Sequence, residues 1–281
     1  MLSVIYGLFS AISWGAGDFA GGLAARKLSA YRAVFYADLL GLLALFIAIT
    51  FYREEIPNAR AMILAAVAGM LGSIGLLVLY FSMTRGQMSI AAPVSALFAA
   101  ALPIVVGAFT QGLPTLIQLI GFGLALLAVW LISQGNSGNR FHINQLSDLR
   151  LPLLAGLGFG SYFIFMHYAV RGISSTFWPL IASRAAGTLM VCAFVLARRE
   201  SFIVQREAWG IVLINAVLDV GGNFFYVLAL KSGRLDISAI LSSLYPGGTV
   251  ILAWLILKER ISLPQWLGIV AALITIVLFT L

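Results

Sequence analysis

Ten apolar segments of about 20 residues follow one another along this chain, and they constrain its fold more than any other feature. An α-helix needs roughly 20 apolar residues to cross a bilayer core of about 30 Å, so each segment is long enough for one crossing. Hydrophobic residues make up 62% of the 281 positions and charged residues only 10%, which excludes an ordinary soluble domain. The sequence therefore predicts an all-α integral membrane protein. The ten expected transmembrane helices are residues 2–21, 31–52, 60–83, 88–108, 114–134, 151–170, 176–197, 207–230, 236–256 and 263–281.

The middle of the chain contains the one longer polar stretch, Gln134–Arg150, which separates five apolar segments from five. It predicts three parts: a first five-helix repeat over residues 1–134, a linker over 135–150 and a second five-helix repeat over 151–281.

The two halves also align with each other. A shift of 147 positions, without a gap, places Ser95 on Ser242 and Gly121 on Gly268. Each repeat has an odd number of helices, so the second enters the membrane in the opposite orientation to the first. The sequence therefore predicts two inverted-topology repeats, the architecture of many secondary transporters.

Several short motifs carry a family resemblance. The segment Asp236–Leu278 contains Lys258-Glu259-Arg260 and then Gln265-Trp266-Leu267-Gly268, and the first half contains Trp14-Gly15. These motifs resemble the EamA-like repeat of the drug/metabolite transporter superfamily over nearly the whole chain. Gly112 departs from the pattern, because it stands where the second half has Glu259. The resemblance implies secondary transport of a small organic metabolite or drug, most often export, across the inner or plasma membrane of a bacterium or archaeon.

The orientation of the chain is left open by the charges. The formal net charge is +7, and the Lys and Arg residues lie in the short gaps between apolar segments, where they act as topology signals. Their distribution places both termini outside the cytoplasm, whereas the family resemblance implies that both are inside. Because these charges are spread over short loops, no nucleic-acid partner is expected; the expected partners are the lipid bilayer and a small-molecule substrate, with a monomer favoured over a homodimer.

Four charged residues, Asp18, Asp38, Arg184 and Asp219, fall within apolar segments. A charge at membrane depth costs several kcal/mol and usually faces a bundle interior or a water-filled cavity. Each of the four is a candidate for a transport site, or else for a fixed ion pair that holds helices together. Asp38 lies near a helix end and is the weaker candidate, while Arg184 is expected to pair with Asp219 or Asp18.

Two polar stripes follow helical spacing in the second half. One consists of Asp219, Asn223 and Tyr226, and the other includes Ser242 and Tyr245. The alternative for such stripes is hydrogen bonding between helices. Most of their first-half counterparts are apolar, so substrate anchors are expected mainly in the second half. The predicted substrate-binding residues are Trp14, Tyr80, Ser95, Arg184, Asp219, Asn223, Tyr226, Ser242 and Tyr245.

Asp18 is the predicted proton-coupling residue. It follows Trp14 by one helical turn, so that an aromatic and a carboxyl side chain share one face of the first helix. A distant resemblance to small multidrug resistance proteins, which place an essential carboxylate in their first helix, points to the same role. If Arg184 keeps Asp18 ionised instead, the protein is a passive facilitator.

Other chemistries find little support in the sequence. No Gly-rich phosphate loop with a lysine is present, which argues against direct use of ATP. Two histidines and one cysteine argue against a metal site, and no cofactor is expected. We expect no enzymatic activity, although a membrane scaffold and a lipid-modifying enzyme remain alternatives to a transporter.

Overall fold

The described part of the chain folds into helices and contains no strand. The computed structural model describes residues 1–82, 88–132, 150–258 and 260–280. Helices are expected here because a bilayer core offers no water to backbone N–H and C=O groups, which must therefore pair within each segment. The elements are α1 (Leu2–Lys27), α2 (Ala30–Tyr52), α3 (Ala59–Ser82), α4 (Met88–Thr110), α5 (Leu116–Ile132), α6 (Arg150–Val170), α7 (Phe177–Ala197), the short 3-10 helix η3 (Arg206–Ala208), α8 (Trp209–Ser232), α9 (Leu235–Ser242), α10 (Tyr245–Leu257) and α11 (Leu263–Thr280).

Several of these helices have the length and apolarity of membrane spans, which confirms an all-helical, multi-pass membrane protein. Six segments of the described chain qualify by length and composition, and the last of them joins α9 and α10. Three shorter apolar helices accompany them, at Ser95–Thr110, Leu116–Ile132 and Leu263–Phe279. The six segments are Tyr31–Tyr52, Ala59–Leu79, Arg150–Val170, Phe177–Ala197, Arg206–Ser232 and Leu235–Ile256.

The segment expected as one helix over residues 236–256 is broken in the structure. Helix α9 ends at Ser242 and α10 begins at Tyr245, after a tight turn in which the N–H of Leu244 bonds to the carbonyl of Leu241 at 3.2 Å. The physical reason is Pro246, which has no N–H to donate to the carbonyl of Ser242. Pro93, by contrast, lies inside the continuous helix α4.

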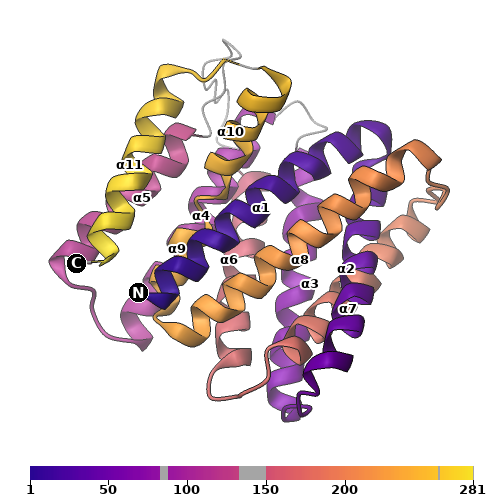
Figure 1. Ribbon diagram of the computed structural model, residues 1–281, viewed down its shortest axis with the longest axis horizontal. Helices are drawn as coiled ribbons and strands as arrows, with labels where there is room; N and C mark the ends of the chain where they lie inside the picture. Colours follow the sequence, from indigo (N-terminus) through magenta and orange to yellow (C-terminus); the bar gives the residue numbers. More distant parts are fainter. Residues whose placement is uncertain (83–87, 133–149, 259, 281) are drawn as a thin grey trace.

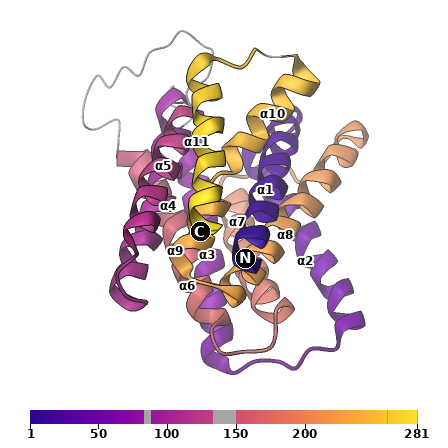
Figure 2. The ribbon, with the colours of Figure 1, turned by 60° about the vertical axis from the view of Figure 1, so that its left-hand side comes forward.

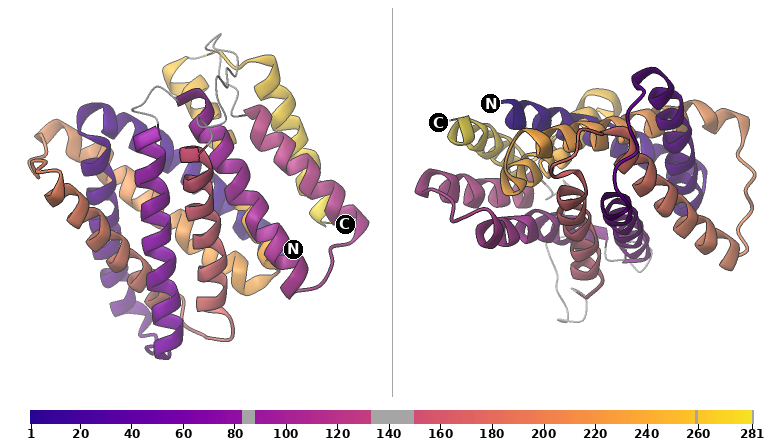
Figure 3. Two further views of the ribbon diagram at one scale, coloured as in Figure 1. Left: turned by 180° about the vertical axis from the view of Figure 1, so that it is seen from behind. Right: turned by 90° about the horizontal axis from the view of Figure 1, so that it is seen from below.

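The helices pack in a reciprocal pattern. Helix α1 lies along α8 and α3 lies along α6, while α2 packs on α7 and α5 on α11. The α1–α8 pair forms one side of the bundle, and the view from behind in Figure 3 shows α3 and α6 on the other. The α5–α11 pair stands at one edge (Figure 1). The first helix of each half thus packs on the third helix of the other half.

The helices connect at two ends of the bundle, named face A and face B. Face A contains the α1–α2, α7–α8 and α10–α11 connections, and face B contains the N-terminus with the α2–α3, α4–α5, α6–α7 and α8–α9 connections. Figures 1 and 2 show face A at the top and face B at the bottom.

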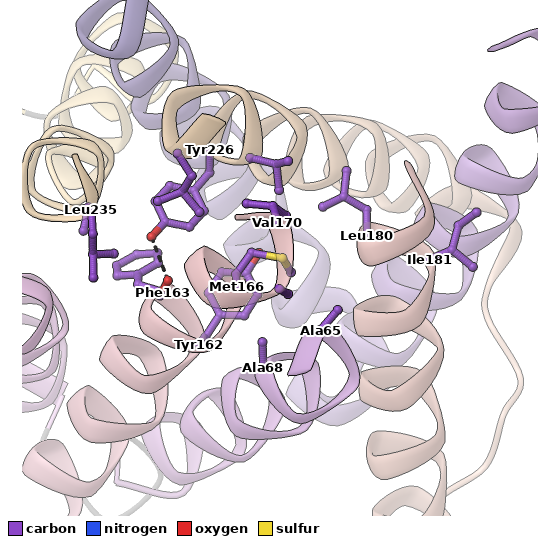
Figure 4. Packing of buried hydrophobic residues seen from close by; sticks show 14 of the residues in the cluster. Ala65, Ala68, Tyr162, Phe163, Met166, Val170, Leu180, Ile181, Tyr226 and Leu235 are labelled. Carbon is purple, nitrogen blue, oxygen red and sulfur yellow. Dashed lines mark hydrogen bonds between the residues drawn. The ribbon is translucent and has the colours of Figure 1, made fainter. Parts of the chain in front are cut away.

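The main hydrophobic core occupies the half of the bundle toward face B. Its largest fully buried side chains include Met166 near the end of α6, Leu180 near the start of α7 and Tyr226 toward the end of α8. Figure 4 shows the hydroxyl of Tyr226 donating a hydrogen bond of 3.1 Å to the carbonyl of Phe163. Dense apolar packing therefore fills the space between the bundle centre and face B.

Candidate functional site

A cavity of about 220 Å³ lies above this core, between α1, α2, α3, α6, α7 and α8. Its lining runs from the bundle centre toward face A: Asp18 lies in the second half of α1, Val34 in the first half of α2 and Leu79 near the end of α3. Each of these positions is in the half of its helix that ends or begins at face A. The core closes the cavity toward face B, so the site extends toward one end of the bundle.

A buried ion triad forms the charged side of the cavity. The two terminal nitrogens of Arg184 in α7 bind separate carboxylates, Nη1 donating to Asp38 of α2 and Nη2 to Asp219 of α8. The side chains are 9%, 12% and 30% exposed, respectively. A guanidinium fork suits this arrangement because it stays charged and offers donors in two directions. Asp219 was one of the two partners expected for Arg184, and Asp38 takes the place of Asp18.

Asp18 lies apart from the triad. Its carboxylate lines the cavity, is exposed, and forms no hydrogen bond or ion pair with the described residues. It is within electrostatic range of Asp219. Close packing of α1 on α8 brings the two together, since a methyl group at Gly17 would lie only 3.3 Å from the backbone nitrogen of Asp219.

Aromatic and amide groups form the rest of the polar wall. The hydroxyl of Tyr162 in α6 donates to Oδ1 of Asn223, whose Nδ2 donates to the carbonyl of Asp219 at 2.7 Å. Trp14 packs edge-on to Tyr245 with ring centroids 6.5 Å apart. Its indole fills the space in front of Gly222, where a methyl group would lie 2.3 Å from Cδ1 of Trp14.

The structure brings six of the sequence-predicted site residues together on the cavity wall. They are Trp14, Asp18, Arg184, Asp219, Asn223 and Tyr245. Two of the six come from the first half, and Asp38 adds a third first-half side chain, so the wall is less biased toward the second half than the polar stripes suggested.

The other predicted site residues lie elsewhere. Tyr226 is fully buried in the core, and Ser242 is fully buried with no hydrogen-bond partner for its hydroxyl among the described atoms. Ser95 is buried where α4 packs closely on α6. A methyl group at Gly156 of α6 would lie only 2.8 Å from the carbonyl oxygen of Ser95. None of the three lines this cavity. The side chain of Tyr80 lies outside the described residues.

Asn215 and Ser73 also line the cavity, and neither is among the residues predicted from the sequence. Asn215 precedes Asp219 by four positions, so the polar stripe of α8 begins one turn earlier than expected. Ser73 belongs to no polar stripe of this kind, so no sequence pattern pointed to it. The described ranges contain no group of three or more His, Cys, Asp and Glu side chains placed to hold a metal.

A network of polar contacts joins the helices at face B. Nζ of Lys231, at the end of α8, donates to the carbonyl of Ser175 and to the hydroxyl of Thr176, both at 3.0 Å. Trp178 donates from Nε1 to the carbonyl of Glu54 at 3.0 Å. The α2–α3 and α6–α7 connections are thereby held to each other and to α8.

A second face B cluster closes the end near α4 and α9. Arg234 binds the fully buried carboxylate of Asp236 at 2.7 Å and the carbonyls of Gln111 and Gly112. The hydrogen bonds that Arg234 donates to Asp236 raise the pKa of Arg234 above its ordinary value, so the guanidinium stays charged. His167 of α6 contacts Gln111 at 2.9 Å. Face B is thus closed by polar contacts beneath the apolar core.

Comparison with known proteins identifies the fold and the family. A solved crystal structure, described only as that of a protein, superposes with a TM-score of 0.82 over 99% of this chain and 96% of its own, at 13% identity, and so shows the fold alone. A protein of Methanocaldococcus jannaschii described as uncharacterized is 35% identical over 94 residues, which are 33% of this chain and 69% of that protein. The sequence model of the EamA-like transporter family matches twice, over residues 1–134 and 149–281. The expected resemblance is confirmed, and the chain belongs to the EamA-like transporter family.

Proposed function

We propose that this protein is a secondary transporter, working as an exporter, that moves a small organic solute by alternating access. The single observation that carries the proposal is the central cavity, which is closed toward face B. It holds a buried ion triad and the carboxylate of Asp18, which has no partner among the described residues. Charges at membrane depth that face a cavity are typical of substrate and ion pathways. Family membership supports the same reading, since it makes the chain a membrane transporter of the drug/metabolite type.

Alternating access requires two parts that rock around the site. We assign these parts to residues 1–134 and 151–281, with α9 and α10 together making one of ten crossings. The reciprocal pairing of α1 with α8 and α3 with α6 supports an inverted arrangement of the two repeats. The break at Ser243–Leu244 resembles the discontinuous helices near which transporters bind their substrates.

Asp18 is the proposed coupling group. Its carboxylate has access to the cavity and no described partner, so it is free to exchange a proton when the substrate leaves. Arg184 is occupied by Asp38 and Asp219, which removes the main reason to expect a fixed Asp18–Arg184 bridge. The competing function, a passive facilitator, needs no proton exchange at this position.

Flux measurements in proteoliposomes test the proposal. The purified protein should move members of a broad metabolite panel, and a pH gradient should drive accumulation above the equilibrium level. Asp18→Asn should still exchange substrate for substrate but lose the pH-driven accumulation. Full pH-driven accumulation by Asp18→Asn would exclude Asp18 as the coupling group. If no compound of the panel moves and a lipid is chemically converted, the protein is a lipid-modifying enzyme and not a transporter.

A further inference from the structure

The cavity wall carries an excess of negative charge. Three carboxylates and one guanidinium line it among the described residues: Asp18, Asp38 and Asp219 against Arg184. The guanidinium is already divided between two of the carboxylates. Asp18 therefore has no positive charge beside it in the described wall, although it faces the cavity.

This arrangement disfavours an anionic ligand. Nη1 and Nη2 of Arg184 both donate to carboxylates, and a carboxylate or phosphate entering the cavity would have to displace one of them. The displaced aspartate would then be left buried without its partner, which is costly. A ligand carrying both charges meets the same obstacle at its negative end.

The rest of the wall suits the body of a cation. Trp14, Tyr162 and Tyr245 line the cavity, together with Phe159 and Phe163. Aromatic faces attract ammonium groups, and the attraction is stronger when the site is desolvated. The volume of about 220 Å³ lies below the roughly 300 to 1,000 Å³ of sites for drug-sized ligands, so the ligand is small.

We propose that the transported solute is a small organic cation, whose ammonium group binds beside Asp18 and Asp219 and whose apolar body rests against Trp14 and Tyr245. The inference rests on the proposed transport function and adds the chemical class of the substrate. Asp18 provides a carboxylate with no partner in the described part of the chain, and Asp219 contributes the carboxylate oxygen that Arg184 does not hold.

Three probes of similar shape test the charge requirement directly. They are phenethylamine, its neutral N-acetyl derivative and the anion 3-phenylpropionate. Each is titrated calorimetrically into the purified protein and assayed for flux in proteoliposomes. The amine should bind about tenfold or more tightly than either of the others, because only the amine forms a charge-assisted contact.

Matched variants separate the site from general effects. Asp18→Asn should reduce amine affinity about tenfold and leave the affinity for the neutral probe unchanged. Asp18→Glu should keep the preference for the amine. Glu207→Gln removes an exposed carboxylate of η3 that does not line the cavity, and should bind all probes like the parent.

The outcomes distinguish this inference from the proposed function. Equal or tighter binding of the neutral or anionic probe, no binding of the amine, or an unchanged amine affinity in Asp18→Asn would each overturn the cation class. If the neutral or anionic probe is then transported, the proposed transport function still holds and only the substrate class is wrong. Specific binding of the amine without flux of any probe would support the cation site and overturn transport.

Discussion

The carboxylate of Glu54, in the α2–α3 connection, accepts a hydrogen bond of 2.8 Å from the backbone N–H of Phe177, the first residue of α7. The same oxygen accepts bonds of 2.8 Å from the N–H of Thr176 and the hydroxyl of Ser175. The first N–H groups of a helix have no partner within the helix and lie at the positive end of its dipole, so an acid there stabilises it. Glu54 therefore ties the first half of the chain to the second at face B.

We expect Glu54→Ala to let face B open more often. Loss of a helix cap costs about 0.5 to 2 kcal/mol, which corresponds to a roughly 2- to 30-fold change in an opening equilibrium. The readout is the rate at which a maleimide modifies Ala65→Cys, in a Cys192→Ser background that removes the single native cysteine. Ala65 is fully buried in α3, between the cavity residue Gly69 and face B.

Glu55→Ala is the matched control, because Glu55 is the exposed neighbour and no hydrogen bond or ion pair of its side chain is described. Its modification rate should equal that of the parent. Identical modification rates in the Glu54 and Glu55 variants would show that the hydrogen bonds of Glu54 do not hold face B closed.

Gly69→Ala should destabilise the protein. A methyl group at Gly69 would lie 1.9 Å from the carbonyl oxygen of Ser183, so α3 and α7 would have to separate beside Arg184. Overpacking of this kind costs about 1 to 3 kcal/mol. The control, Gly123→Ala, adds its methyl group to α5 with no atom within 4 Å and should stabilise the helix by about 0.5 to 1 kcal/mol. Unfolding in one detergent compares the two, and equal stability would contradict the close contact.

Arg184→Leu should be among the most damaging single changes. It leaves the carboxylates of Asp38 and Asp219 close together without their shared partner, and breaking a buried pair costs about 3 to 5 kcal/mol. The partial exposure of Asp219 favours the lower end. Adding Asp38→Asn and Asp219→Asn should recover most of the loss, whereas Asp18→Asn alone should unfold like the parent. If Arg184→Leu unfolds and transports like the parent, the triad has no structural role.

The sequence predicted the helices well because each apolar segment must satisfy its own backbone. The helix expected over residues 236–256 contains Pro246, which has no N–H to continue the helical hydrogen bonds. The full break also depends on tertiary contacts that no local pattern reveals: a methyl group at Gly15 would lie 2.5 Å from the carbonyl of Tyr245, and Thr249 donates to the carbonyl of Gly15 at 2.9 Å. These contacts hold α10 against α1.

The site was harder to predict because helical spacing gives the face of a residue but not its depth. Asp219 and Tyr226 share a face of α8, yet seven positions separate them, about 10 Å along the helix, which places Tyr226 within the core. Asp38 illustrates the same limit. Its position near the helix end did not identify its partner, whereas the packing of α2 on α7 places it against Arg184.

Tyr226 and Tyr245 provide the last test, since the same substitution should lower stability at the first position and substrate affinity at the second. Tyr226→Phe removes a buried hydrogen bond to the carbonyl of Phe163, which should cost about 1 kcal/mol of stability and leave substrate affinity unchanged. Tyr245→Phe changes a cavity wall residue and should weaken binding of the transported solute by about fivefold at near-parent stability. Unfolding and calorimetric titration on the same preparations measure both effects. A larger loss of affinity in Tyr226→Phe than in Tyr245→Phe would mean that the solute binds outside this cavity.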